Sequence, residues 1–380
     1  MQKRRILSAA ARIGLIALTA FLLLASAGCA PSGSGAFPAD SSAGSAAGEV
    51  NDMNEMSGTN TTTETSSSGK ESFRNPLIPP EGADPWVIFH DGYYYYCFSE
   101  NDGLFVTKAR NLYEIGTETP VRVYTPPAEG EFTADYWAPE LHYLEGKWVI
   151  YVAADDGQNE NHRMIALESS TGDPQGTYVF RGKVSDPSDK WAIDGTAMTI
   201  GGKLYFVWSG WEGDVNVAQN LYIAPMSDPF TISGSRVRIS RPEYDWETVG
   251  DPQVNEGPEA LTAPSGAIHI VYSASGSWTD DYCLGLLTLA GEDPLDPASW
   301  VKADKPVFSK AKSAYGPGHA SFTVAPDGEN WIVYHACKTP GGGWAARSVR
   351  AQSFFWDGDT PVFGKPAPLT EKQEIARNPG

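Results

Sequence analysis

The 380-residue sequence predicts an all-β protein, and more specifically a five-bladed β-propeller. Five segments share one pattern, in which a tight turn at a glycine leads into a strand rich in aromatic and β-branched residues. The turn glycines recur every 54 to 64 residues, at Gly92, Gly146, Gly202, Gly266 and Gly328. A fixed period of this length, made of strands and turns, indicates one propeller blade per repeat. The alternative is five unrelated hairpins in a β-sandwich, and the even spacing disfavours it.

Residues 1–29 resemble a bacterial lipoprotein signal peptide. Three basic residues near the start precede an apolar stretch over residues 13–24, and small residues follow it before Cys29. The apolar stretch is too short to span a membrane. We expect Cys29 to become the lipid-bearing N-terminus, although Ser26 stands where such signals prefer an aliphatic residue. An ordinary secretory signal cut nearby is the alternative.

Residues 30–72 consist mainly of Ser, Gly, Thr, Ala and acidic residues, with almost no large apolar side chain. Such a segment cannot bury enough surface to offset the entropy of ordering, so we expect a disordered tether. The expected organisation is therefore a signal peptide (1–29), a linker (30–72) and a propeller domain (73–380). This predicts an exported protein, anchored to the bacterial membrane only through Cys29, or secreted if Cys29 is not lipidated.

The composition limits the partners of the propeller. Its 300 or so residues suit one large domain with a sizeable core, which we expect to be monomeric. The net charge of −19 argues against a nucleic-acid partner. The three cysteines of the domain lie in apolar strand contexts, which favours buried thiols over a disulfide: Cys97, Cys283 and Cys337.

Three acidic residues enter their hairpins in nearly the same phase. Asp84, Asp194 and Glu256 lie 8, 8 and 10 residues before their turn glycines, so the propeller brings their carboxylates to one end of its axis. A single Asp-Pro turn is most simply a backbone cap, but three acids in phase disfavour that explanation. A pair of carboxyl groups with pKa values driven apart is what glycoside hydrolysis requires. The sequence has no P-loop, no Gly-x-Ser-x-Gly motif and no zinc-spaced histidine pair.

One short motif in each blade carries a resemblance to a known family. The chain from about residue 74 to about residue 370 resembles the family-43 glycoside hydrolases, which are inverting five-bladed propellers. The matching motifs follow in blade order: Ala83-Asp84-Pro85, Trp137-Ala138-Pro139-Glu140, Ile193-Asp194-Gly195, Asn255-Glu256-Gly257-Pro258 and Gly316-Pro317-Gly318-His319. Five such motifs in order are far more specific than any one of them.

The resemblance implies distinct roles for the three acids. Asp84 would be the general base that deprotonates the attacking water, and Glu256 the general acid that protonates the leaving group. Asp194 would orient the acid and raise its pKa. An inverting mechanism implies a separation of roughly 6.5–9.5 Å between the base and acid carboxyl groups. Gly195 departs from the family, which often has proline at that position.

The resemblance also implies secondary site residues. Trp137 and Trp211 would contact the sugar, with a place in the core as the alternative. Arg347, nine residues before Trp356, would hydrogen-bond the substrate and the acid, with a surface arginine as the alternative. His319 would hold a cation in the central channel, usually calcium, largely through water molecules.

The motifs of blades four and five look most like those of exo-acting α-L-arabinofuranosidases. The expected reaction is inverting release of arabinose from arabinan or its oligosaccharides. Endo-arabinanase and β-xylosidase activities of the same family are the alternatives, together with a glycan-binding lipoprotein that has lost catalysis. A retaining, sucrose-acting propeller is disfavoured because its nucleophile motif differs.

Overall fold

The computed structural model describes residues 69–100 and 103–378, and within these ranges the chain is almost entirely β-structure. The helical elements of the described ranges are 3-10 helices of three residues each: η1 (Leu112–Glu114), η2 (Asn159–Asn161), η3 (Asp245–Glu247), η4 (Pro297–Ser299) and η5 (Trp344–Ala346). In the described part of the chain, no helix is long and apolar enough to cross a membrane. The expected signal peptide and Cys29 lie outside the described residues.

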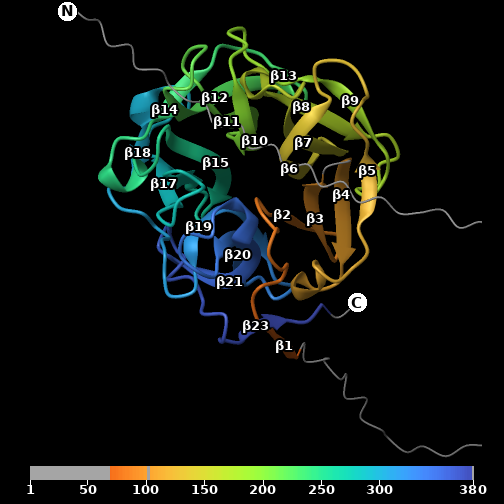
Figure 1. The fold of residues 1–380 in the computed structure, drawn as a ribbon, viewed down its shortest axis with the longest axis vertical. Coiled ribbons are helices and arrows are strands. Elements are labelled where there is room, and N and C mark those ends of the chain that lie inside the picture. The colour runs from red at the N-terminus through yellow and green to blue at the C-terminus, as the bar shows by residue number, and fades with distance from the viewer. Residues whose placement is uncertain (1–68, 101–102, 379–380) are drawn as a thin grey trace, which may run out of the picture. The chain divides into compact units, whose positions relative to one another are not determined.

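Five antiparallel sheets are arranged around a centre, with the first strand of each sheet innermost (Figure 1). Blade one contains β2 (Trp86–His90), β3 (Tyr93–Glu100), β4 (Gly103–Ala109) and β5 (Val121–Tyr124). Blade two contains β6 (Ala134–Leu144), β7 (Lys147–Asp155), β8 (Arg163–Ser169) and β9 (Tyr178–Lys183). Blade three contains β10 (Ala192–Ile200), β11 (Lys203–Gly210), β12 (Ala218–Asp228), β13 (Thr231–Ile232) and β14 (Val237–Ser240).

The last two blades follow the same plan. Blade four contains β15 (Gln253–Thr262), β16 (Ile268–Ala274), β17 (Cys283–Leu289) and β18 (Trp300–Lys302). Blade five contains β19 (Tyr315–Val324), β20 (Asn330–Cys337), β21 (Arg347–Asp357) and β22 (Thr360–Val362). A short parallel pairing of β12 with β15 joins blades three and four into one continuous sheet. The all-β, five-bladed fold predicted from the sequence is confirmed.

The hairpins between the first and second strands turn at the predicted glycines. Their φ angles are 74°, 79°, 77°, 94° and 87°, for Gly92, Gly146, Gly202, Gly266 and Gly328 in that order. Side chains larger than hydrogen rarely adopt this left-handed conformation, which explains why glycine recurs at these turns.

The hydrophobic core is divided among the five interfaces between neighbouring blades. Each interface holds a cluster of buried apolar side chains contributed by both blades. One pair from each cluster, starting between blades one and two and going round the ring, is Val106 with Ile150, Tyr151 with Phe206, Val207 with Ile270, Val271 with Ile332, and Val333 with Val87. Because the last cluster joins blade five to blade one, the ring is closed.

The two ends of the propeller domain pair with each other. Strand β1 (Lys70–Phe73) lies antiparallel to β23 (Gln373–Ala376), and the bond from the Leu77 amide to the Val349 carbonyl ties the following segment to blade five. Residues 70–72, which we had assigned to the linker, therefore belong to the folded domain. The three cysteines of the domain are free and buried, as predicted.

Candidate active site

Every blade has a left-handed bend at one equivalent residue, in or just before its innermost strand. The φ angles at the bend are 46°, 43°, 53°, 51° and 45°, for Asp84, Ala138, Asp194, Gly257 and His319 in blade order. In blades two to five the strand pairing shifts register beside or across this residue, which is the behaviour of a β-bulge. Bends of this kind are uncommon for residues with a side chain and are concentrated at functional sites. Glu256 directly precedes the bend of its own strand.

Asp84 lies just before β2 and is surrounded by positive and polar groups. Arg347 Nη1 donates to Asp84 Oδ1 at 3.1 Å. The Nδ1 atoms of His319 and His335 lie 3.3 and 3.2 Å from the same oxygen. Burial raises the pKa of the Asp84 carboxyl, but Arg347 and the two imidazoles outweigh burial, so the pKa lies well below its ordinary value. Asp84 is therefore ionised at any physiological pH.

Glu256 lies on β15 and is only 7% exposed. The Tyr282 hydroxyl donates to Glu256 Oε1 at 2.8 Å. Burial, with a smaller contribution from the charge of Asp84, raises the pKa of Glu256 to about 7 against the hydrogen bond from Tyr282. Ser277 also hydrogen-bonds this carboxylate and lowers its pKa. Glu256 can thus hold a proton near neutral pH, where Asp84 cannot.

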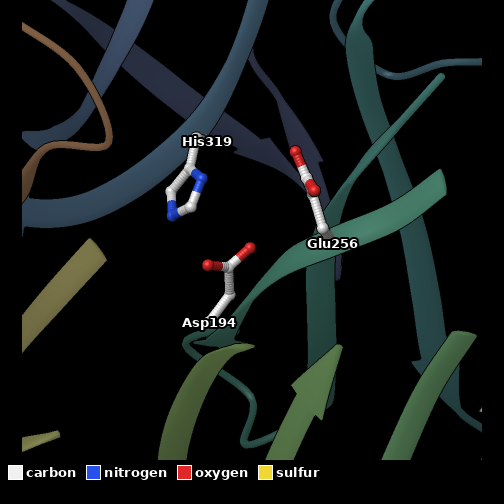
Figure 2. Close-up of side chains that lie close together, drawn as sticks. All are labelled: Asp194, Glu256 and His319. Carbon is white, nitrogen blue, oxygen red and sulfur yellow. The ribbon is translucent and has the colours of Figure 1, made fainter. Parts of the chain in front are cut away.

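Asp194 lies on β10, beside both Glu256 and His319. Figure 2 shows the three side chains pointing toward one another. One oxygen of each carboxyl group and one nitrogen of the imidazole lie within 4.8 Å of one another. The Gly257 amide donates to Asp194 Oδ2 at 3.0 Å, which ties this carboxyl to the residue after Glu256. Burial raises the pKa of Asp194 well above its ordinary value, as do the Glu256 and Asp84 charges. The Asp194 and Glu256 carboxyls consequently titrate as a pair.

Two residues of the site had no signal in the sequence. His335 on β20 is fully buried, its Nδ1 accepts a hydrogen bond from the Asp84 amide at 3.2 Å, and its pKa is lowered to about 4, chiefly by burial. Tyr282, just before β17, stacks on His335 with ring centroids 5.6 Å apart and an interplanar angle of 8°. Together these two aromatic residues link the surroundings of Asp84 to those of Glu256.

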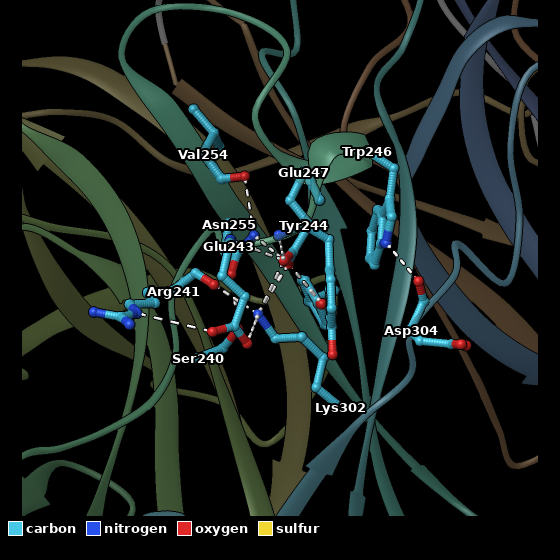
Figure 3. Close-up of polar contacts among 12 residues, drawn as sticks. Ser240, Arg241, Glu243, Tyr244, Trp246, Glu247, Val254, Asn255, Lys302 and Asp304 are labelled. Carbon is cyan, nitrogen blue, oxygen red and sulfur yellow. Dashed lines mark hydrogen bonds and ion pairs between the residues drawn. The ribbon is translucent and has the colours of Figure 1, made fainter.

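A buried polar network fixes the chain just before Glu256 (Figure 3). Glu247, at the end of η3, is fully buried and accepts hydrogen bonds from Asn255 Nδ2 at 3.1 Å and from the Tyr272 hydroxyl at 2.8 Å. Lys302 Nζ lies 3.0 Å from Glu247 Oε1 and balances its charge. Ser240 donates to the other end of the Asn255 amide at 2.7 Å. The side chain of Asn255 is therefore held at both ends, and it precedes the acid directly.

The other predicted residues have different environments. Arg347 begins β21 and contacts Asp84 directly, and its charge also lowers the pKa of Glu256, although burial is the main influence there. Trp137 is 40% exposed and packs against His162 with the two rings tilted by 30° and their centroids 4.0 Å apart. Trp211 is only 5% exposed and stacks on Trp191 in the core between blades two and three. Trp211 therefore has the environment given above as the alternative, a place in the core, and its contact with the substrate stays a prediction.

A cavity of about 470 Å³ opens beside Asp84 and Arg347. It runs between the segment 78–82 and blade one, and the bend of blade two contributes to its wall. The lining residues nearest the acid cluster are Ala83, Asp84, Ala138, Pro139 and Arg347. A second cavity, of about 650 Å³, lies at Lys310, Gln352 and Lys365 and includes none of the three acids. The first is the cavity within reach of the chemistry, and its size suits a small sugar ligand.

The residues around His319 fit a bound cation. Burial lowers the pKa of His319, so the neutral ring can offer a nitrogen lone pair. Glu140 Oε1 is buried without a hydrogen-bond partner, and its charge acts on both His319 and Asp194. Burial and Glu140 raise the pKa of Glu259 well above its ordinary value. Buried carboxyl groups crowded in this way would be stabilised by a hard cation, which prefers oxygen ligands and water.

Comparisons with known proteins agree with this geometry. Residues 73–361 match the family described as glycosyl hydrolases family 43. An extracellular exo-α-(1→5)-L-arabinofuranosidase of Streptomyces avermitilis is 38% identical over 316 residues, which cover 78% of this chain and 64% of that protein. A protein of the same description from Streptomyces chartreusis is 38% identical over 273 residues, covering 70% of this chain and 82% of its own length.

Solved structures give the same result. The crystal structure of an α-L-arabinofuranosidase from Lactobacillus brevis superposes with a TM-score of 0.73 at 37% identity, covering 78% of this chain and 98% of that one. An endo-arabinase from Bacteroides thetaiotaomicron, at 18% identity and a TM-score of 0.61, shares the fold. The family match, the closed ring of five blades and the acids at the strand bends together show that this chain belongs to family 43 of the glycosyl hydrolases.

Proposed function

We propose that this protein is an inverting α-L-arabinofuranosidase that releases terminal arabinose from arabinan or arabinan-derived oligosaccharides. The observation that carries the proposal is the opposite displacement of two pKa values in one site. Asp84 is held well below its ordinary pKa by Arg347 and two imidazoles, which outweigh burial, whereas burial raises Glu256 to about 7. Carboxyl groups separated in this way provide a base and an acid at the same pH.

In the proposed mechanism, Asp84 accepts a proton from the attacking water while Glu256 gives its proton to the glycosidic oxygen. The water oxygen bonds to the anomeric carbon as the bond to the leaving oxygen breaks, so the configuration inverts. The two proton transfers leave Asp84 protonated and Glu256 ionised, and exchange with solvent restores both. Arg347 keeps Asp84 ionised and oriented before the reaction.

Asp194 is the proposed positioning acid. It is bound to the Gly257 amide and therefore fixes the backbone directly after Glu256. Besides burial, the charge of Asp84 raises the pKa of Glu256. The Glu256 charge also raises the pKa of Asp194, and because this repulsion is mutual, Asp194 opposes ionisation of Glu256 as well. We therefore keep for Asp194 the role expected from the sequence, which is to orient the acid and raise its pKa.

The substrate proposal is supported by the relatives named above. Two of them are described as exo-α-(1→5)-L-arabinofuranosidases, and both are described as extracellular. This chain spans 64% of the length of the Streptomyces avermitilis relative. An exported enzyme acting on arabinose-containing glycans agrees with the signal sequence, and a lipid on Cys29 would keep it at the cell surface.

A cation near His319, with calcium as the expected ion, is also proposed. His319 would hold it, with Glu140 and Asp194 acting through water. A bound cation would supply positive charge that lowers the cost of placing several carboxylates in one buried site. The residues of this chain still carry out the proton transfers.

Hydrolysis assays test the proposal. The protein should release arabinose from 4-nitrophenyl α-L-arabinofuranoside and from linear α-1,5-arabinan, with little action on the corresponding aryl β-xyloside. Proton NMR of the first product should show the β-anomer, which would indicate inversion. Glu256→Gln should abolish hydrolysis of arabinan. Preferred cleavage of xyloside, or production of long oligosaccharides from arabinan, would refute the exo-arabinofuranosidase assignment.

A further inference from the structure

The exposed tryptophans of this protein are confined to the surroundings of the acid cluster. All twelve tryptophans lie in the described ranges, and three of them are classed as exposed: Trp137 at 40%, Trp278 at 38% and Trp344 at 58%. Trp137 directly precedes two residues that line the cavity at Asp84. Trp278 and Trp344 lie on loops of blades four and five, and the proposed mechanism assigns them no role. An exposed indole costs hydration free energy, so a grouping at one site points to a ligand.

Trp278 and Trp344 form a pair with defined geometry. Their ring centroids lie 6.2 Å apart and their planes meet at 84°, so one ring presents an edge to the other. Trp278 packs against two glycines, and a methyl group built on Gly276 would lie 2.6 Å from its ring. A methyl group on Gly250 would lie 3.1 Å from the same ring. The absence of side chains at these glycines lets the indole pack closely on the chain, while Trp278 remains 38% exposed.

The loop that carries Trp344 is also built to hold it. Gly343, at φ 62°, precedes the short helix η5 that begins with Trp344. The Gly341 amide donates to Asp280 Oδ1 at 2.8 Å, which ties this loop to blade four. The glycine run at 341–343 therefore supports a tryptophan at a fixed place.

The pair lies on the acid side of the site. Trp344 Nε1 donates to Ser277 Oγ at 3.0 Å, and Ser277 in turn hydrogen-bonds the Glu256 carboxylate. Trp278 follows Ser277 directly in the chain. The carbonyl of Trp344 also accepts from Arg347 Nε at 3.2 Å. A single serine thus separates the aromatic pair from the group that protonates the leaving oxygen.

We propose that Trp278 and Trp344 form the binding subsite for the first sugar on the leaving-group side of the scissile bond. This inference rests on the proposed function, because it takes Glu256 as the general acid. In an inverting displacement the base and the acid lie on opposite sides of the reacting sugar, so the departing chain lies beside the acid. The occupant is an arabinosyl residue of the arabinan chain. Its carbon-bound hydrogens would pack on the exposed indole rings, and its hydroxyls would reach Ser277 and Asp280.

The test is the preference of the enzyme between a long and a minimal leaving group. We compare kcat/KM on α-1,5-arabinotriose with kcat/KM on methyl α-L-arabinofuranoside, whose leaving group is too small to reach the pair. The ratio of the two values should fall about tenfold in Trp344→Ala and in Trp278→Ala, as expected for loss of an aromatic contact of about 1.4 kcal/mol. Trp344→Phe should recover much of the ratio. Phe355→Ala is the matched control, since Phe355 is 62% exposed at the other end of β21.

A binding measurement gives a second readout. In a Glu256→Gln background, arabinotriose should quench tryptophan fluorescence, and adding Trp344→Ala should weaken the binding about tenfold. An unchanged ratio in both tryptophan variants would overturn the subsite, and so would an equal loss on both substrates. No hydrolysis of either substrate by the unaltered protein would instead refute the proposed function itself.

Discussion

The hydrogen bond from Tyr282 to Glu256 allows a quantitative test of the proposed acid. Tyr282 donates to Glu256 Oε1 at 2.8 Å, and this bond favours the ionised carboxylate. The substitution Tyr282→Phe keeps the ring that stacks on His335 and removes only the hydroxyl. Burial would then raise the pKa of Glu256 with less opposition, so the pKa should increase.

The expected magnitude follows from the bond that is lost. A hydrogen bond to a charged group is worth about 1.5 to 3 kcal/mol, and one pKa unit corresponds to about 1.4 kcal/mol. The lower value predicts an increase of about one unit, from about 7 to about 8. Because Glu256 must be protonated to act, the fall of kcat/KM at high pH should move upward by the same amount.

The assay is a profile of kcat/KM on arabinotriose from pH 4 to pH 10, with each enzyme normalised to its own plateau. At pH 8 the relative activity of Tyr282→Phe should be about five times that of the unaltered enzyme, as protonation rises from about a tenth to about a half. Tyr334→Phe is the control, because the Tyr334 hydroxyl bonds Gln352 and leaves Glu256 untouched. A downward shift, or no shift with the plateau retained, would show that Glu256 does not set the basic limb.

Four further substitutions test the site and its backbone. Burial raises the folded-state pKa of Glu256 from 4.5 to about 7. The stability that the Glu256 side chain contributes is therefore present below pH 4.5 and is lost as pH rises through 7. Urea unfolding should show Glu256→Gln to be more stable than the unaltered protein by about 3 kcal/mol at pH 8, and by almost nothing at pH 4. A Gln variant that is the less stable of the two at pH 8 would contradict this. Arg347→Ala removes the main charge that opposes the effect of burial on Asp84, so the pKa of Asp84 should rise. The acidic limb of the kcat/KM profile should then move to higher pH. An acidic limb at unchanged pH would show that Arg347 does not keep the base ionised. Ala138→Gly should stabilise the fold by up to about 1 kcal/mol, because glycine adopts a φ of 43° without strain. Gly257→Ala should destabilise the fold, because the φ at this position is 51° and the new methyl group would lie 3.2 Å from the His319 ring. Thermal unfolding measures the stability of both variants. If the two substitutions change the stability equally, the strain attributed to the bend is refuted.

The fold was predictable because its signals are local. Each first hairpin needs a residue with positive φ at its turn, and glycine meets that need at Gly92 and its four counterparts. The acids at 84 and 194 were found for the same reason, since each occupies a bend at a fixed distance from its turn. Glu256 fitted the spacing less well, and the structure explains why: the bend in blade four is Gly257, and the acid precedes it.

The surroundings of the acids could not be predicted, because they depend on contacts between distant parts of the chain. His335 lies 251 positions from Asp84, and Tyr282 lies 26 positions from Glu256. Sequence spacing carries no information on such pairs until the blades close into a ring. The core position of Trp211 was hard to predict for a related reason. Trp211 follows the last residue of β11, where strand alternation no longer fixes which way a side chain points.

The bends occur in all five blades, whereas the residues that occupy them differ in chemistry. Blade two has the same left-handed bend as the others, yet the residue there is Ala138, which has no functional group. The bend is therefore a property of the propeller, and it supplies positions at which any blade can place a group at the centre. Blades one and three use aspartate and blade five uses histidine, residue types that tolerate this conformation better than most. Blade four uses glycine, whose amide binds Asp194, and the proposed acid is the glutamate that precedes it. The chemistry proposed for this protein thus depends on which residues occupy these bends, or directly precede them, whereas the bends themselves come from the fold.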